Sequence, residues 1–197
     1  YGVAPRAMIV PIKAFDYNGS AYVSDIILGV DWCIQNSLHI INMSFGMKSR
    51  SQSLYDAMFN AYKSGVVIVA SSGNDGKLGN IDYPAKFRCT ISVGATNKNR
   101  AIAAFSNRGK QVDVYAPGDK IVSTWLNDKY HQLSGTSMAT SHVSGVIALM
   151  LSINSKLTPK KVKALLKRTA LPVKSSKSSG SQSAVEIYAV RAVNGSK

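Results

Sequence analysis

The sequence has few cysteines, few histidines and few acidic residues, and it lacks any long hydrophobic run. Cys33 and Cys89 fit neither a metal-binding spacing nor a dense disulfide framework, so we expect both to pack as small apolar residues. The longest apolar candidate, Val143–Ile153, is interrupted by serine and glycine and falls short of the roughly 18 apolar residues of a membrane span. We therefore expect no membrane partner, and we find no secretory signal at the start of the chain.

Acidic charge is outnumbered by basic charge: 24 Lys and Arg residues against 10 Asp and Glu residues give a formal net charge of +14. Part of the excess gathers in residues 156–177, as Lys156, Lys160, Lys161, Lys163, Lys167, Arg168, Lys174 and Lys177. Such a cluster can bind nucleic acid or another anionic surface. No aromatic residues are interleaved for base stacking, so we favour a solvated helix face with a basic tail and expect no nucleic-acid partner.

The length of 197 residues suits one domain or most of one, and an apolar content of 45% is ordinary for a globular core. Short β-rich runs alternate with amphipathic helices, which is typical of an α/β domain with a parallel sheet. We expect strands at Met8–Ala14, His39–Met43, Val66–Ala70, Thr90–Ala95, near 112–115 and 120–125, and at Lys129–Leu133. We expect helices at Ser24–Asn36, with Ser24 as a cap, at Ser53–Lys63, after Ser137, after Thr158-Pro159 and over Ala184–Val193. The Ser-, Lys- and Gly-rich stretch 173–183 predicts a mobile loop.

Residues 134–145 read Ser-Gly-Thr-Ser-Met-Ala-Thr-Ser-His-Val-Ser-Gly and open an apolar run long enough for a buried helix. This places the Ser137 hydroxyl in the first helical turn, where unpaired N–H groups and a partial positive charge favour an oxyanion. A serine there can act as an acyl-transfer nucleophile when a histidine takes its proton. The alternative is that Ser137 only caps the helix.

An asparagine follows the expected strand Val66–Ala70, in the loop Ser71-Ser72-Gly73-Asn74-Asp75-Gly76. Functional loops of parallel sheets lie at the carboxyl ends of strands. The Asn74 amide can therefore donate a hydrogen bond to a developing oxyanion. The same residues also fit a plain turn.

Four segments together resemble the subtilisin-like serine proteases. Residues 134–145 resemble the nucleophile segment, usually Gly-Thr-Ser-Met-Ala-x-Pro-His-Val-x-Gly, with Ser141 in the place of proline. Ser71–Gly76 resembles the oxyanion segment, and Ile41–Gly46 resembles Ile-Asn-Met-Ser-Leu-Gly. Tyr83–Phe87 resembles Tyr-Pro-Ala-Lys-Tyr, in which the Tyr-Pro bond is cis. The resemblance covers nearly the whole chain and weakens in its C-terminal part.

This resemblance implies a three-layer α/β fold, with a mostly parallel sheet flanked by helices, and a serine endopeptidase activity. Ser137 would be the nucleophile, and Asn74 with the Ser137 N–H would form the oxyanion hole. The substrate would add as a strand beside one wall of the S1 pocket, with a second wall opposite. The implied walls are Ser44, Phe45 and Gly46, and Ser71, Ser72 and Gly73.

Two carboxylates fall near this pocket by the same alignment, Asp82 at its floor and Asp75 at its rim. Carboxylates there would favour Lys or Arg at P1 through charge-assisted hydrogen bonds. The alternative is two solvated loop carboxylates.

The resemblance also shows what this chain does not contain, because the family's catalytic Asp and His segments precede the part represented here. None of His39, His131 and His142 lies in a matching motif. The strand that carries the catalytic Asp would lie between Met8–Ala14 and His39–Met43, and its absence would leave two apolar edges unpaired. We therefore expect a partial peptidase domain over 1–197, incomplete at its N-terminus, that alone is inactive and poorly folded. The alternative is a pseudoprotease or regulatory partner that keeps the substrate groove.

Cofactor and partner expectations follow from the family. The chemistry would require no cofactor, although the complete domain could hold structural calcium. A weaker cation site would use carbonyls near Ala85, Phe87 and Thr90. The expected partners are a protein or peptide substrate, the N-terminal part of the same domain, and a propeptide or inhibitor. The expected location is extracellular.

Overall fold

The computed structural model describes residues 2–174 and 184–197. Apart from its first two residues, the expected mobile loop at 173–183 therefore lies outside the described residues.

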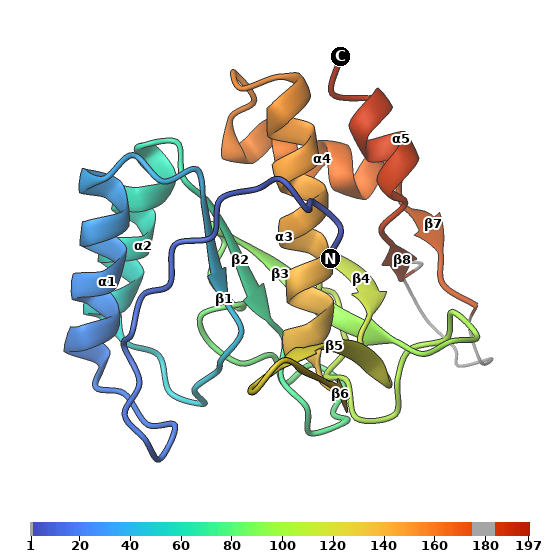
Figure 1. Cartoon of the computed structure of the whole chain (residues 1–197), viewed down its shortest axis with the longest axis horizontal. Coiled ribbons are helices and arrows are strands. Elements are labelled where there is room, and N and C mark those ends of the chain that lie inside the picture. Colours follow the sequence, from blue (N-terminus) through green and yellow to red (C-terminus); the bar gives the residue numbers. More distant parts are fainter. Residues whose placement is uncertain (1, 175–183) are drawn as a thin grey trace.

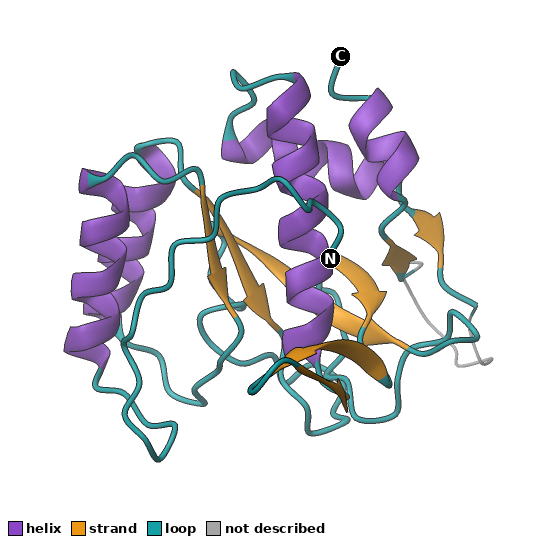
Figure 2. Cartoon of the chain, viewed as in Figure 1, coloured by secondary structure: helices purple, strands orange, loops and turns teal. Residues whose placement is uncertain are grey.

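A six-stranded sheet forms the centre of the fold (Figures 1 and 2). Neighbouring strands of this sheet pair in parallel except the last two, which are antiparallel. The second and third strands are buried along their whole length, as expected for strands covered on both faces. The spatial order is β1 (Ile40–Met43), β2 (Val67–Ser71), β3 (Thr90–Thr96), β4 (Val114–Pro117), β8 (Val185–Glu186) and β7 (Leu171–Pro172). β5 (Ile121–Trp125) and β6 (Lys129–Leu133) form a separate antiparallel hairpin.

Two helical layers cover the sheet, and the alternation of β2 side chains shows how. Val67 and Val69 pack in one apolar cluster with helix α3 (Thr136–Ile153). Residues of α4 (Pro159–Thr169) and α5 (Ala189–Asn194) belong to the same cluster. Ile68 and Ala70 pack in a second cluster with α1 (Val23–Gln35) and α2 (Gln52–Lys63). The expected mostly parallel α/β sheet flanked by helices is therefore confirmed.

Local signals explain where several helices begin and end. The Ser51 hydroxyl accepts from Leu54 N at the start of α2, and Gly65 adopts a φ of 92° just beyond its end. The Thr158 hydroxyl accepts from Lys161 N, and Pro159 is the first residue of α4. The expected Ser24 cap of α1 is wrong, because Tyr22 occupies that position and makes no side-chain cap bond.

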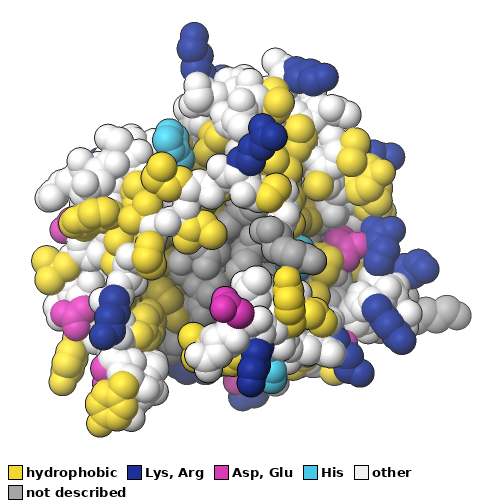
Figure 3. All heavy atoms as spheres, in the orientation of Figure 1, with side chains coloured by type: hydrophobic (Ala, Val, Ile, Leu, Met, Phe, Trp, Pro, Cys, Tyr) yellow, Lys and Arg dark blue, Asp and Glu magenta, His cyan; other side chains and the backbone are white. Residues whose placement is uncertain are grey.

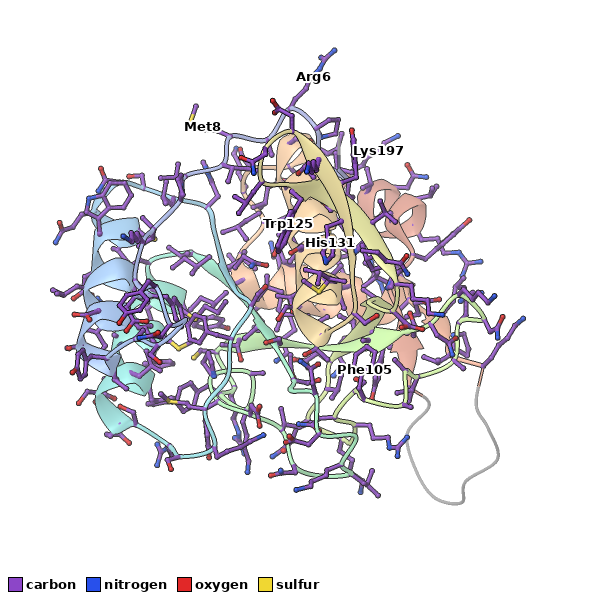
Figure 4. The ribbon with its side chains drawn as sticks, turned by 60° about the horizontal axis from the view of Figure 1, so that its bottom comes forward. Arg6, Met8, Phe105, Trp125, His131 and Lys197 are labelled. Carbon is purple, nitrogen blue, oxygen red and sulfur yellow. The ribbon has the colours of Figure 1, made fainter. Side chains whose placement is uncertain are left out.

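The expected strand at Met8–Ala14 is wrong. Residues 8–14 carry no strand assignment, and no ladder joins them to another segment of the described chain. Met8 and Ile9 are 90% and 87% exposed, and Met8 extends away from the ribbon in Figure 4. Hydrophobic side chains are correspondingly prominent on the face that includes α1 and the preceding segment (Figure 3). An apolar run forms a strand only where a neighbouring strand satisfies its backbone groups.

The expected helix at Ala184–Val193 is also wrong in its first half. Val185–Glu186 pairs with β4 and β7 instead, and Ile187 N donates to Tyr115 O at 2.8 Å. Only Ala189–Asn194 is helical.

Helix α3 is long and apolar enough to cross a membrane, by length and composition, with a mean hydropathy of 1.3. In this fold it contacts strands β1 to β4, and its Val143, Ile147 and Met150 side chains are fully buried. It is therefore the central core helix of the domain.

The two cysteines are unpaired and buried, at 4% exposure for Cys33 and 7% for Cys89. Burial raises the pKa of both thiols, that of Cys89 to about 11. Their expected role as small apolar core residues is confirmed.

A charged cluster joins α4 to the sheet at Asp113. The carboxylate accepts from Ser92 N at 3.0 Å, and its oxygens lie 2.8 Å from Lys163 Nζ and 3.3 Å from Lys167 Nζ. The Asp113 side chain is 10% exposed, so both ammonium groups meet a largely desolvated partner.

Replacing Asp113 with asparagine should lower the free energy of unfolding by roughly 2–3 kcal/mol. The Lys163 side chain, 28% exposed, would lose its counter-ion in a partly buried place. Denaturant titration of the full-length protein measures the change. Lys167→Met is the matched control: its pair is more exposed and longer, so its loss should stay under about 1 kcal/mol. Equal losses for the two variants would contradict this expectation.

Candidate active site

The loop after β2 meets the N-terminus of α3 through Asn74 and Thr136. Asn74 Oδ1 accepts from Thr136 N and from Thr136 Oγ1, both at 2.9 Å. Gly135 N, just before the helix, donates to Gly118 O at 2.8 Å. The carboxyl end of a buried strand and the positive end of a core helix are thereby held together.

The nitrogen atoms of the two predicted oxyanion donors lie near the same point. Asn74 Oδ1 accepts both hydrogen bonds from Thr136, so the amide nitrogen Nδ2, on the other branch of the side chain, points away from Thr136. A methyl group built on Gly135 would lie 3.6 Å from Asn74 Nδ2 and 3.8 Å from Ser137 N. An oxyanion bound there would find a side-chain donor, a backbone donor and the helix dipole together.

The Ser137 hydroxyl is bonded to a backbone carbonyl. Ser137 Oγ donates to Ser44 O at 2.9 Å, and Ser44 Oγ donates in return to Ser137 O at 3.2 Å. The sequence-predicted residues Ser44, Asn74 and Ser137 are therefore brought together. A carbonyl oxygen cannot take the proton of a nucleophile, so the base must come from another group.

The three histidines make their contacts elsewhere. His142 Nδ1 lies 2.9 Å from Met138 O on α3 itself. The His131 ring packs on Trp125 across the β5–β6 hairpin, with centroids 4.9 Å apart (Figure 4). His39 is exposed immediately before β1.

Asp82 lies between the two predicted pocket walls. Asp82 N donates to Ser72 O at 3.1 Å, and the Tyr83–Pro84 bond that follows is cis, as expected. A methyl group built on Gly46 would lie 2.9 Å from Asp82 Oδ2, and one on Gly73 would lie 2.5 Å from it. Side chains at those two glycines would collide with the carboxylate, so the absence of a Cβ on each wall makes room for it.

Lys48 binds both pocket carboxylates, and sequence reasoning missed it. Its ammonium bonds Asp75 Oδ2 and lies 2.8 Å from Asp82 Oδ1. Hydrogen bonds to Asp75 and Asp82 raise the pKa of Lys48, and the bond from Lys48 lowers the pKa of Asp75. Asp82 is only 7% exposed, so the alternative of two solvated loop carboxylates is wrong for this residue.

A second missed residue, Asn107, shapes the loop that carries Asn74. Its buried side chain accepts from Asp75 N at 3.0 Å and from Lys77 N at 3.2 Å, and donates to Ser72 O at 3.1 Å. None of the four segments that carry the family resemblance includes Asn107.

The expected weaker cation site does not fit the residues present. The Thr90 hydroxyl lies 2.7–3.1 Å from the carbonyl oxygens of Pro84, Ala85 and Phe87. Lys163 Nζ donates to Thr90 O at 2.7 Å, so a positive charge already lies where a divalent cation would bind. Within the described ranges 2–174 and 184–197, no group of three or more His, Cys, Asp or Glu side chains could hold a metal ion.

The fold is that of the subtilisin-like serine proteinases. A crystal structure of a cold-adapted subtilisin-like serine proteinase superposes with a TM-score of 0.89 at 38% identity, covering 96% of this chain and 69% of that one. The model of the subtilase family matches residues 1–189, and the chain belongs to that family.

Curated relatives extend well beyond the aligned region. Minor extracellular protease Epr of Bacillus subtilis (strain 168) is 45% identical over 149 residues, which are 76% of this chain and 23% of that protein. Subtilisin DY of Bacillus licheniformis is 43% identical over 172 residues, 86% of this chain and 63% of that protein. The chain thus spans less than two thirds of either relative.

Proposed function

We propose that, within a complete catalytic domain, this chain carries the nucleophile and oxyanion hole of a serine endopeptidase. The observation that supports the proposal is that Asn74 Nδ2 and Ser137 N lie 3.6 and 3.8 Å from one point at the N-terminus of α3, where Ser137 also carries its hydroxyl. Ser137 Oγ would attack the scissile carbonyl and lose its proton to a histidine outside this chain, which an aspartate would orient. The oxyanion would form against Asn74 and Ser137 N, the amine would leave, and water would then release the acyl group.

The substrate would pair with the segment that follows β1, and the open side of β1 itself would remain for the missing strand. β1 pairs only with β2 in the described sheet, and Ser44, Phe45 and Gly46 continue directly from its carboxyl end. Backbone pairing there would supply affinity, while Ser71, Ser72 and Gly73 would close the S1 pocket from the other side. A propeptide or inhibitor would use the same groove.

The chain would be a partial domain that needs its N-terminal part. The unpaired side of β1 and the exposed residues Met8 and Ile9 are apolar surfaces of the kind that a missing strand would cover. The complete enzyme would need no cofactor for its chemistry. An extracellular location agrees with the name of one relative, a minor extracellular protease.

Fluorophosphonate labelling tests this proposal. The full-length protein should be labelled at Ser137 and should cleave peptides, whereas the 197-residue chain alone should do neither. Failure of the full-length protein to label, with its fold intact, would overturn the endopeptidase assignment. Hydrolysis by the isolated chain well above its Ser137→Ala variant would overturn the need for a missing part.

A further inference from the structure

Two connections, one between β1 and α2 and one between β2 and β3, bring one lysine and two carboxylates together at the predicted S1 pocket. Lys48 follows β1, Asp75 follows β2, and Asp82 immediately precedes the cis Tyr83–Pro84 bond. The Lys48 ammonium bonds both carboxylates. Since Lys48 lies 27 and 34 residues from the two carboxylates in the sequence, its contact with them depends on the tertiary fold and is not a local surface pair.

The carboxylate at the pocket floor is fixed, whereas the lysine can leave. The Asp82 side chain is 10% exposed and is packed against Gly46 and Gly73, with its own N–H bonded to Ser72 O. The Lys48 side chain is 59% exposed and has four rotatable side-chain bonds. The site therefore combines a rigid anionic acceptor with a displaceable internal cation.

We propose that Lys48 is a specificity-determining residue that occupies the position a basic P1 side chain would take. This inference rests on the proposed endopeptidase function. A substrate Lys or Arg can reach Asp82 only by displacing Lys48, and the ammonium that it displaces loses both hydrogen-bonded partners. A neutral P1 side chain binds with the Lys48 pairs intact. The full-length enzyme therefore prefers neutral P1 residues despite the two carboxylates in its pocket.

Removing the Lys48 charge should create the basic preference that it suppresses. In Lys48→Met, Asp75 and Asp82 would carry two unpaired negative charges, and a substrate Lys or Arg would be the nearest cation to neutralise them. The ratio of kcat/KM for P1 Arg over P1 Leu should rise roughly 10-fold. The rise should not be larger, because Asp75 at the pocket rim is partly exposed and exposed ion pairs contribute little. The gain should shrink as ionic strength rises, because salt screens exposed charges.

The experiment compares peptides that are identical except for Arg, Lys, Leu or Phe at P1, cleaved by the full-length protein. Lys48→Arg keeps the charge and donors and should retain the wild-type preference. Lys77→Met is the matched control, because it removes the same charge from the Asp75 loop and leaves the Lys48 pairs in place. Adding Asp82→Asn to Lys48→Met should abolish most of the gained preference.

The outcomes separate this inference from the function on which it rests. If wild type already prefers P1 Arg or Lys, or if Lys48→Met and Lys77→Met give the same P1 ratio, the role of Lys48 is refuted while the endopeptidase stands. If wild type cleaves none of the peptides and does not label, the proposed function falls, and the Lys48 inference with it. Lys48→Gln offers a second neutral variant if methionine impairs folding.

Discussion

Replacing Ser137 with alanine is expected to abolish peptide hydrolysis by the full-length protein while leaving its fold unchanged. Loss of the hydroxyl removes the atom that would form the acyl-enzyme, and removal of this nucleophile is known from a subtilisin to cost about 10⁶-fold in kcat. The hydrogen bond from the Ser137 hydroxyl to Ser44 O is a single exchangeable contact, so the free energy of unfolding should change by less than about 1 kcal/mol. Stopped peptide assays and denaturant titration measure the two effects separately.

Ser144→Ala is a matched control on the same helix. Its hydroxyl donates to Asn42 Oδ1 of β1 at 2.9 Å, two residues before the Ser44 that Ser137 contacts, but it lies two turns from the helix N-terminus. This variant should keep kcat within about twofold. Residual hydrolysis by Ser137→Ala at a comparable rate would show that another group is the nucleophile.

The fold could be predicted largely because local signals agree with the tertiary structure. The continuous apolar runs that became β2 and β3 are buried on both faces, and caps at Ser51 and Thr158 start the helices that they precede. The strand predicted at Met8–Ala14 was wrong for the opposite reason. Its composition suits a strand, but a strand also needs a neighbouring strand to pair with.

The site was predictable where its chemistry resides in a contiguous motif. Ser137 and Asn74 each stand in a recognisable sequence motif, and Asn74 Nδ2 and Ser137 N lie 3.6 and 3.8 Å from one point beside Gly135. Lys48 and Asn107 were missed because their roles arise from contacts across 27 to 35 residues of sequence, which no periodicity or spacing signals. The expected preference for Lys or Arg at P1 took account of Asp75 and Asp82, but not of Lys48, which the fold brings into contact with both.

Replacing Asn74 with aspartate should lower kcat by about 10²–10³-fold with little change in KM, a size known for an oxyanion-hole donor in a subtilisin. The new side chain keeps an oxygen to accept from Thr136 N and Oγ1, so the loop should stay attached to α3. A carboxylate near a helix N-terminus is itself favourable, which helps to preserve the fold. Only the amide donor is lost, and the oxygen in its place repels a developing oxyanion. Steady-state kinetics on a neutral P1 peptide would separate kcat from KM.

Asn74→Leu provides the necessary contrast, because it removes both the donor and the acceptor. Its kcat should fall as far, but its free energy of unfolding should fall as well, by about 1–2 kcal/mol, since two Thr136 donors lose their partner. If the aspartate variant retained kcat, Asn74 would be a structural tether and not an oxyanion donor. If both variants lost stability equally, the acceptor bonds to Thr136 would not be what holds this loop. The expected pattern, a shared loss of kcat with a loss of stability only in the leucine variant, separates the catalytic role of the amide nitrogen from the structural role of its oxygen.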